Sequence, residues 1–367
     1  MPNALESGLD STSGSRSLRP AGRAEEGPAV AGQAGTGMSA DVGRYHHIVI
    51  CMDHSQFAER ALLHAAAMAH IWDAQLTLLH VLEHHPGGGD RVPVDAFDWL
   101  VRRQEARRFL EDAAAHPRLE ELTVHTELQE GRAAEQIRAW AVGNGVDLIV
   151  LSTHGESGDS RWSLAGNAHK LVEGVDTSIL LVPSTVTSPE VGRSVEYARI
   201  LLPLDGSSLA ERAIPVAMRL AAAPGAELIV ALSLDRPGMF HSSAPSAEEM
   251  EIEDRVRTYN ERAAGEYLAS KLAQLKAAGI PARSVLVRSG DPRDALMQVA
   301  SRERADLIIL SAHGASGRFK AACGNVASHF ITHTSAPLLI VREPGEYEEM
   351  SRCSCDEDLR ISHLAPQ

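Results

Sequence analysis

The chain has 367 residues, 44% of them hydrophobic, which is enough for two domains of ordinary size. The 49 acidic residues outnumber the 35 Lys and Arg residues, and the formal net charge of −14 argues against a nucleic-acid-binding protein, which should carry a basic patch. No apolar run is long enough to span a membrane, and the chain does not open on an apolar signal-peptide core. We therefore expect a cytoplasmic protein, and its four cysteines fit such a reducing compartment better than a disulfide framework.

The first half of the chain predicts one α/β domain behind a polar segment. Residues 1–44 are rich in Gly, Ala, Ser, Pro and Arg, so we expect them to be disordered. A domain over 45–184 follows, in which strands and helices alternate. Its predicted strands are 46–53, 75–82, 123–129, 146–152 and 178–183. Its predicted helices are 56–72, 95–116, 131–144 and 165–174.

The second half predicts the same order of elements. A polar linker over 185–197 leads into a domain over 198–343, and a polar tail over 344–367 ends the chain. The predicted strands are 198–205, 226–234, 283–289, 305–311 and 337–342. The predicted helices are 208–223, 247–278, 292–304 and 324–334. Near-continuous apolar strands that alternate with helices indicate two α/β, Rossmann-like domains, each with a five-stranded, mostly parallel sheet covered on both faces.

A glycine loop follows the fourth predicted strand of each half. In the second half, Ser311 and Gly314 are followed by nine residues and then by Gly324, Asn325 and Val326. Small residues let a backbone approach a ligand closely, and a helix N-terminus that begins at Gly324 would offer unpaired N–H groups to an anion. The first half repeats this pattern with one residue more between the glycines, in Ser152, Gly155, Gly166 and Asn167.

An aspartate ends the first predicted strand of each half, and Ala-Glu-Arg-Ala follows in both cases. Asp53 and Asp205 could each accept hydrogen bonds from a ribose or a base at the carboxyl edge of the sheet. An aspartate just before a helix can equally cap that helix, and the spacing alone leaves both roles open. Val81 and Leu234, at the ends of the second strands, would form an apolar wall for a base or ordinary core.

These motifs, in the same order twice, resemble the universal stress protein family over all but the two ends of the chain. The resemblance implies an adenine nucleotide alpha hydrolase-like fold, an aspartate that faces the adenosine of ATP, and a loop that holds the phosphates. It also implies that the fifth strands, 178–183 and 337–342, pair with each other. Ser311 and Ser152 replace the first glycine of the family loop, and the longer loop of the first half favours the second half as the binding site.

Binding is better supported than catalysis. Neither loop has the Gly-Lys-Ser/Thr of a Walker motif, and no residue commits the chain to hydrolysis, so we assign no catalytic residue. His154 and His313 precede the loop glycines, where a loop-shaping role is favoured over catalysis. Arg161, Arg318 and Lys320 could neutralise phosphate. Cys353 and Cys355 lack the further ligands of a zinc site, so we assign no metal.

The hypothesis that follows is an ATP-binding regulatory or stress-response protein, with Mg²⁺ as an optional companion of the nucleotide, that acts on an unidentified protein partner. The alternatives are an interaction module of the same fold that binds no nucleotide and a slow ATPase. Whether two chains pair into a homodimer is left open.

Overall fold

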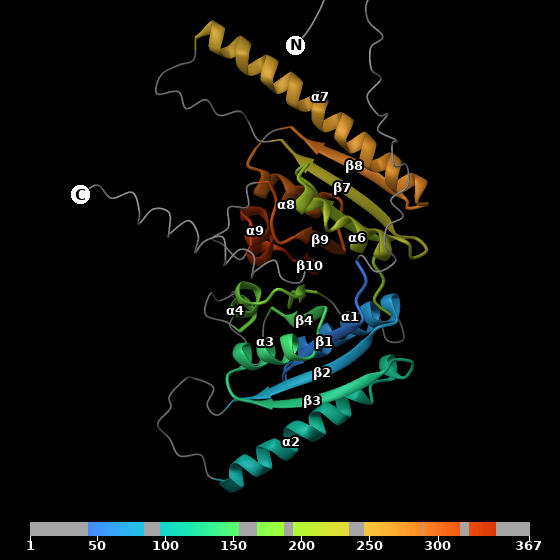
Figure 1. Ribbon diagram of the computed structural model, residues 1–367, viewed down its shortest axis with the longest axis vertical. Coiled ribbons are helices and arrows are strands. Elements are labelled where there is room, and N and C mark those ends of the chain that lie inside the picture. Colours follow the sequence, from blue (N-terminus) through green and yellow to red (C-terminus); the bar gives the residue numbers. More distant parts are fainter. Residues whose placement is uncertain are drawn as a thin grey trace, which may run out of the picture. The chain divides into compact units, whose positions relative to one another are not determined.

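The computed structural model describes residues 43–83, 96–153, 167–186, 194–234, 246–288, 290–315 and 323–342. These ranges hold the helices and strands of both halves (Figure 1). Residues 1–42 of the predicted disordered segment lie outside the described residues, and so does the whole predicted tail over 344–367.

The first half contributes five parallel strands in the order β3-β2-β1-β4-β5. Ile48, Val49 and Ile50 of β1 are completely buried, which fits a strand covered on both faces. By contrast, β3 is an edge strand in which no residue is fully buried and two are exposed. The strands are β1 (His47–Met52), β2 (Gln75–Leu82), β3 (Val124–Glu130), β4 (Leu148–Ser152) and β5 (Ser178–Val182).

The second half repeats this arrangement in the order β10-β9-β6-β7-β8. The two halves meet where β10 pairs antiparallel with β5, with Leu339 opposite Leu180. This pairing covers two apolar strand edges and joins the halves into one ten-stranded sheet. The strands are β6 (Arg199–Pro203), β7 (Glu227–Ser233), β8 (Ala282–Val287), β9 (Leu307–Ser311) and β10 (Leu338–Val341).

Helices from both halves cover each face of the sheet. One apolar core contains side chains of α1 (Gln56–Trp72), α2 (Ala96–Ala114), α5 (Ser208–Glu211), α6 (Ile214–Ala221) and α7 (Ala247–Ala277). The core on the opposite face contains side chains of α3 (Ala133–Gly143), α4 (Asn167–Gly174), α8 (Pro292–Arg302) and α9 (Asn325–His333). A short 3₁₀ helix, η1 (Pro117–Leu119), follows α2. Each core runs across both halves, so the junction is part of the hydrophobic interior.

The prediction of a single helix over 208–223 was wrong, because the segment folds as the two helices α5 and α6. Pro215 lies in the first turn of α6. It has no N–H to donate, and its ring would clash with the carbonyl of Glu211 if the helix were continuous. Proline is well accommodated in a first turn, so the chain ends one helix and begins another.

Polar contacts also join the halves. His64 Nδ1 lies 2.8 Å from the Tyr197 hydroxyl, and both side chains are buried. The Arg219 guanidinium donates to the Ile71 carbonyl at 3.2 Å. Arg342, just after β10, donates to the carbonyls of Val172 and Val175 in the first half. None of the helices described here is long and apolar enough to cross a bilayer.

Candidate functional site

The predicted site of the second half lies at the carboxyl ends of β6 and β9, which are neighbours in the sheet. The chain passes from β6 to β7 on one side, whereas β9 lies on the other side of β6. The strand order therefore reverses at β6. Open α/β sheets bind ligands at such reversal points, outside the carboxyl ends of the strands.

Asp205 leaves the end of β6 and joins two separate segments. Its Oδ1 accepts from the Ser207 N–H at 2.9 Å and from the Ser207 hydroxyl at 2.6 Å. Its Oδ2 accepts from the Ala315 N–H, in the loop after β9, at 2.6 Å. Ser207, not Asp205, is the N-cap of α5, since its hydroxyl oxygen accepts from the Ala210 N–H at 3.1 Å. Asp205 therefore orients the cap and holds the loop against the strand end.

The loop approaches Asp205 so closely that only glycine fits at position 314. A Cβ on Gly314 would overlap Asp205 Oδ2. Gly206, between Asp205 and Ser207, has a φ of +84°, a conformation that glycine adopts without strain. A larger residue at position 314 would therefore displace the Asp205 carboxylate even when no ligand is bound.

The first turn of α9 is the anion-binding feature predicted beside this loop. Gly324 is the N-cap of α9 and provides no side-chain cap, whereas Ser207 caps α5 and Asp291 caps α8. The Gly324 N–H donates to the Ala312 carbonyl at 2.7 Å, which fixes the helix beside the end of β9. The N–H groups that begin with Asn325 and Val326 therefore receive no side-chain acceptor from the N-cap residue, and the helix dipole is positive here.

The remaining predicted residues of this half surround the same strand ends. The Ser311 hydroxyl is buried and has no hydrogen-bond partner among the described residues. His313 is also buried. Leu234 follows β7 and packs on one core of the sheet, whereas Val326 packs on the opposite core. The predicted phosphate-neutralising cations Arg318 and Lys320 lie outside the described residues.

In the first half the aspartate repeats but its surroundings differ. Asp53 Oδ1 accepts from the Ser55 N–H at 3.0 Å and from the Ser55 hydroxyl at 2.5 Å, and Ser55 caps α1. His54 stands where the second half has Gly206, and its ring centroid lies 4.2 Å from that of Phe109 on α2. The His80 ring lies 5.4 Å from His54, so three rings gather beside this strand end.

Only part of the predicted loop of the first half is described. Ser152 ends β4 and is half-buried. Asn167 is the first residue of α4. Gly155 and Gly166 lie outside the described residues, and so do His154 and Arg161. The predicted phosphate contacts of this half therefore stay a prediction.

Val81 and Leu234 do not occupy matching positions in the two halves. Gln75 pairs with His47 at the start of β1, and Glu227 pairs with Arg199 at the start of β6. Counted from these pairs, Val81 matches Ser233. Val81 packs on the core of α3 and α4, whereas Leu234 packs on the core of α6 and α7.

Sequence reasoning did not identify Ser55, Ser207 and the Ala315 N–H as parts of the site. A signal for the serines was present, because each aspartate is followed two residues later by a serine in the same Asp-x-Ser order. The Ala315 N–H had no such signal, since a backbone donor can be located only from the folded loop.

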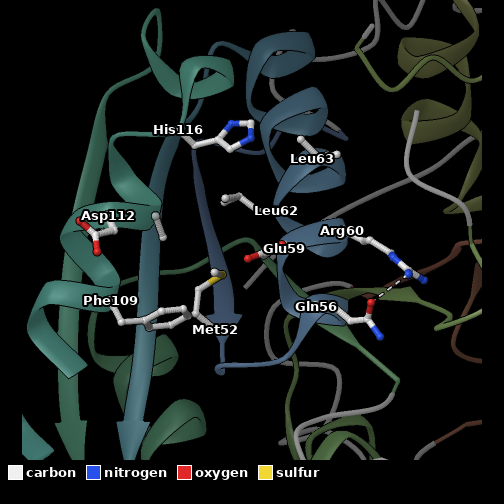
Figure 2. A pocket seen from close by; sticks show the side chains of 10 residues that line it. Met52, Gln56, Glu59, Arg60, Leu62, Leu63, Phe109, Asp112 and His116 are labelled. Carbon is white, nitrogen blue, oxygen red and sulfur yellow. Dashed lines mark hydrogen bonds between the residues drawn. The ribbon is translucent and has the colours of Figure 1, made fainter. Parts of the chain in front are cut away.

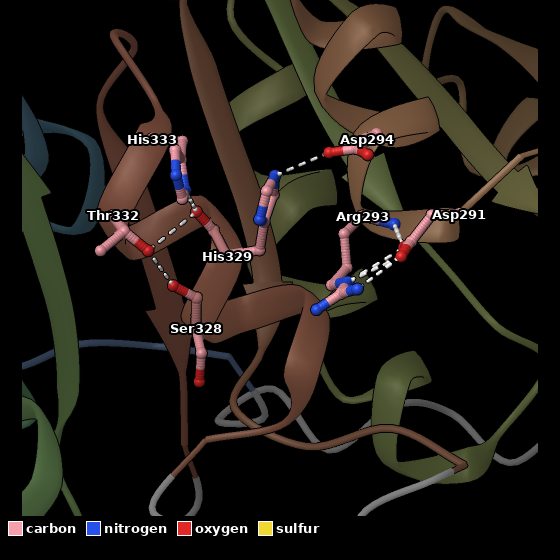
Figure 3. A network of polar contacts seen from close by, with 7 residues as sticks. All are labelled: Asp291, Arg293, Asp294, Ser328, His329, Thr332 and His333. Atoms are coloured by element: carbon pink, nitrogen blue, oxygen red, sulfur yellow. Dashed lines mark hydrogen bonds and ion pairs between the residues drawn. The ribbon is translucent and has the colours of Figure 1, made fainter.

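A second polar cluster lies between α8 and α9, on the face of the sheet opposite α7 (Figure 3). Asp291 caps α8 and binds Arg293, and His329 Nε2 lies 3.5 Å from Asp294 Oδ1. The rings of His329 and His333 stack at 4.3 Å. Burial, followed by the nearby His333, lowers the pKa of His329. Within the described ranges, no group of three or more His, Cys, Asp or Glu side chains could hold a metal ion.

Comparison with known proteins assigns the chain to a family. The universal stress protein family model matches residues 44–183 and 196–342. The universal stress protein Rv2005c of Mycobacterium tuberculosis is 21% identical over 311 residues, which cover 82% of this chain and 98% of the relative.

Two solved structures show the same fold over most of the chain. A universal stress protein from Archaeoglobus fulgidus has a TM-score of 0.55 at 14% identity, covering 83% of this chain and 99% of its own. The functionally unknown protein PA1789 from Pseudomonas aeruginosa has a TM-score of 0.56 at 16% identity, covering 87% and 100%. Since the family model matches once in each half, the chain is a tandem, two-domain member of the universal stress protein family.

Proposed function

We propose that the second half of the chain binds ATP at the carboxyl ends of β6 and β9 and that ATP binding controls contact with a protein partner. The observation that carries the proposal is the assembly of Asp205, Gly314 and the uncapped first turn of α9 around one strand-order reversal. In the family resemblance, the same three features face the adenosine and the phosphates.

The residues of this site fit a nucleotide chemically. The first-turn N–H groups of α9 suit phosphate oxygens, and the buried Ser311 hydroxyl needs an acceptor or donor that the described residues do not supply. Asp205 Oδ2 can accept a further hydrogen bond, since a carboxylate oxygen has two lone pairs and only the Ala315 N–H donates to this one. Mg²⁺, if it accompanies the nucleotide, would be held chiefly by the phosphates and water.

The proposal assigns a regulatory role in the cytoplasm. Neither loop has the Gly-Lys-Ser/Thr of a Walker motif, and the described part of the site has no pair of carboxylates around the loop, so binding is better supported than rapid hydrolysis. We expect about one ATP per chain. The rings of His54, His80 and Phe109 crowd the strand end beside Asp53, whereas the second half has Gly206 in place of His54 and leaves that space open to a ligand. A homodimer and a protein partner remain parts of the proposal.

The first test is to identify nucleotide on freshly purified full-length protein. The protein is denatured and filtered, and the released nucleotide is identified and quantified by chromatography. We expect about one ATP per chain, and calorimetric titration with ATP and magnesium should give the same stoichiometry. Absence of both released nucleotide and binding would reject the proposal in favour of the interaction module, and steady release of phosphate would favour the slow ATPase.

A glycine pair locates the site. A Cβ on Gly324 would meet no atom closer than 3.6 Å, so Gly324→Val should fold while its side chain obstructs the first turn of α9. Gly265, in α7, has no atom within 4 Å of a Cβ and provides the matched control Gly265→Val. We expect Gly324→Val to lose ATP binding and Gly265→Val to retain it. Equal binding by the two folded variants would place the nucleotide elsewhere.

A further inference from the structure

A pocket of about 480 Å³ lies between α1 and α2 in the first half. Figure 2 shows Met52 and Leu62 at its inner side, with Phe109 opposite them and Glu59 between the helices. Asp112 and His116 also line it, from the side of α2 and the turn that follows. The pocket therefore combines an apolar floor with two carboxylates.

None of the described residues neutralises either carboxylate. Glu59 and Asp112 make no hydrogen bond or ion pair with any described residue. Arg60 also lines the pocket, but its guanidinium donates to the carbonyls of Ser184 and Val186 at 2.8 and 3.3 Å. The Arg60 guanidinium therefore binds the segment after β5 and not the carboxylates of the pocket.

In the second half, the carboxylate that matches Glu59 binds an ammonium group of the protein itself. Ser55 and Ser207 cap α1 and α5 in the same way, so Glu59 matches Glu211. Glu211 Oε2 lies 2.7 Å from the ammonium of Lys271, and its Oε1 accepts from the Tyr267 hydroxyl at 2.9 Å. The Lys271 ammonium also lies 5.4 Å from the centre of the Tyr267 ring. One carboxylate and one aromatic ring therefore hold an ammonium there.

The first half keeps the carboxylate and the ring but lacks the ammonium. Leu110 and Leu268 are matching buried residues, because each lies fourteen positions before the matching β3 and β8 residues Val124 and Ala282. Phe109 therefore matches Tyr267, and Ala113 matches Lys271. The short side chain of Ala113 lines the pocket at the place where the second half has its lysine.

We infer that the pocket between α1 and α2 binds a small organic amine with an apolar group, whose ammonium takes the place that Lys271 occupies in the second half. The ammonium would bind Glu59 beside the Phe109 ring, and the apolar group would lie on Met52 and Leu62. A charge-assisted hydrogen bond and a cation–π contact favour such a ligand over a neutral one of the same shape. The site is separate from the loop and from α9 in the proposed ATP site.

The test titrates the full chain with 2-phenylethylamine, protonated at neutral pH, and with the isosteric neutral 2-phenylethanol, by ligand-observed NMR and calorimetry. We expect one saturable amine site per chain and at least about ten-fold weaker binding of the alcohol. Glu59→Gln keeps the shape of the side chain and should weaken amine binding by about ten-fold or more. Glu211→Gln, in the second half, is the matched control and should leave the amine affinity unchanged.

Two reciprocal variants use the internal repeat. Ala113→Lys recreates the lysine of the second half and should abolish amine binding by filling the pocket, in a fold that already accommodates this residue at Lys271. Lys271→Ala should open a second site and raise the stoichiometry to two. Equal binding of amine and alcohol, unchanged binding by Glu59→Gln or Ala113→Lys, displacement by ATP, or no saturable signal up to about 10 mM would each overturn the inference.

Discussion

At the scale of single residues, Asp205 links the end of β6 to the loop after β9 while it also orients the cap of α5. Those contacts make it more than a helix-capping residue. They also explain why position 314 is glycine, since any Cβ there would overlap the carboxylate. The side chain therefore determines where the loop lies before any ligand binds.

Asp205→Asn tests this link. An amide can keep the contact with Ser207 through its oxygen, but its NH₂ group would then face the Ala315 N–H, so the loop loses its acceptor. We expect ATP affinity to fall by about ten-fold and the free energy of unfolding by only about 1 kcal/mol. Calorimetry and urea unfolding measure the two quantities. A loss of several kcal/mol with unchanged affinity would make Asp205 a purely structural residue.

The sequence predicted the aspartates and loop glycines because each has a local signal, namely the end of an apolar run or a repeated spacing. It could not predict the contact between Asp205 and Ala315, because that contact joins segments 110 positions apart. Nor could the sequence show that Val81 and Leu234, at the ends of the second strands, face different cores. Strand register decides which core a side chain faces, and a displacement of one residue moves it to the opposite face.

At the scale of elements, the strands and most helices follow directly from apolar periodicity, and the fifth strands pair as the family resemblance implies. The break between α5 and α6 did have a sequence signal in Pro215, but the apolar pattern continues through it. The pocket between α1 and α2 had none. The pocket depends on Ala113 of α2 lying near Glu59 of α1. Only the folded structure shows that these two residues match Lys271 and Glu211 of the second half.

The uncapped start of α9 gives a prediction in which stability and affinity change in opposite directions. Gly324 has a φ of −67° and a ψ of 165°, which aspartate adopts readily at an N-cap. Gly324→Asp should raise the free energy of unfolding by a few tenths of a kcal/mol, because the carboxylate caps the helix and complements its dipole. It should weaken ATP binding at least about ten-fold, because the same carboxylate occupies and repels the phosphate position.

Urea unfolding and calorimetric titration of the Gly324→Asp variant give both quantities, and Gly324→Ala supplies a control without charge. A variant that is destabilised would leave the loss of affinity explained by local unfolding. A stabilised variant that binds ATP as tightly as the original chain would show that the phosphates do not lie at the start of α9.

At the scale of the whole molecule, the two halves share a sheet and both of its cores. They also share a buried hydrogen bond between His64 of α1 and Tyr197, just before β6. Burial, followed by the nearby Asp306, raises the pKa of Tyr197, so its hydroxyl keeps its proton in the hydrogen bond with His64 Nδ1. Burial lowers the pKa of His64 from 6.5 to about 4, so this histidine is neutral in the native protein.

Because His64 is buried and neutral, we expect acid to lower the free energy of unfolding of the protein. An unfolded chain protonates this histidine below about pH 6.5, whereas the folded chain does so only near pH 4, so its contribution is complete above pH 6.5 and is lost as the pH falls. At pH 5 the free energy of unfolding should be lower by about 2 kcal/mol from this group. The double variant His64→Leu/Tyr197→Phe removes both partners and should show a shallower decrease between pH 7 and 5 in urea unfolding. Equal pH slopes for the two proteins would show that His64 does not carry the effect.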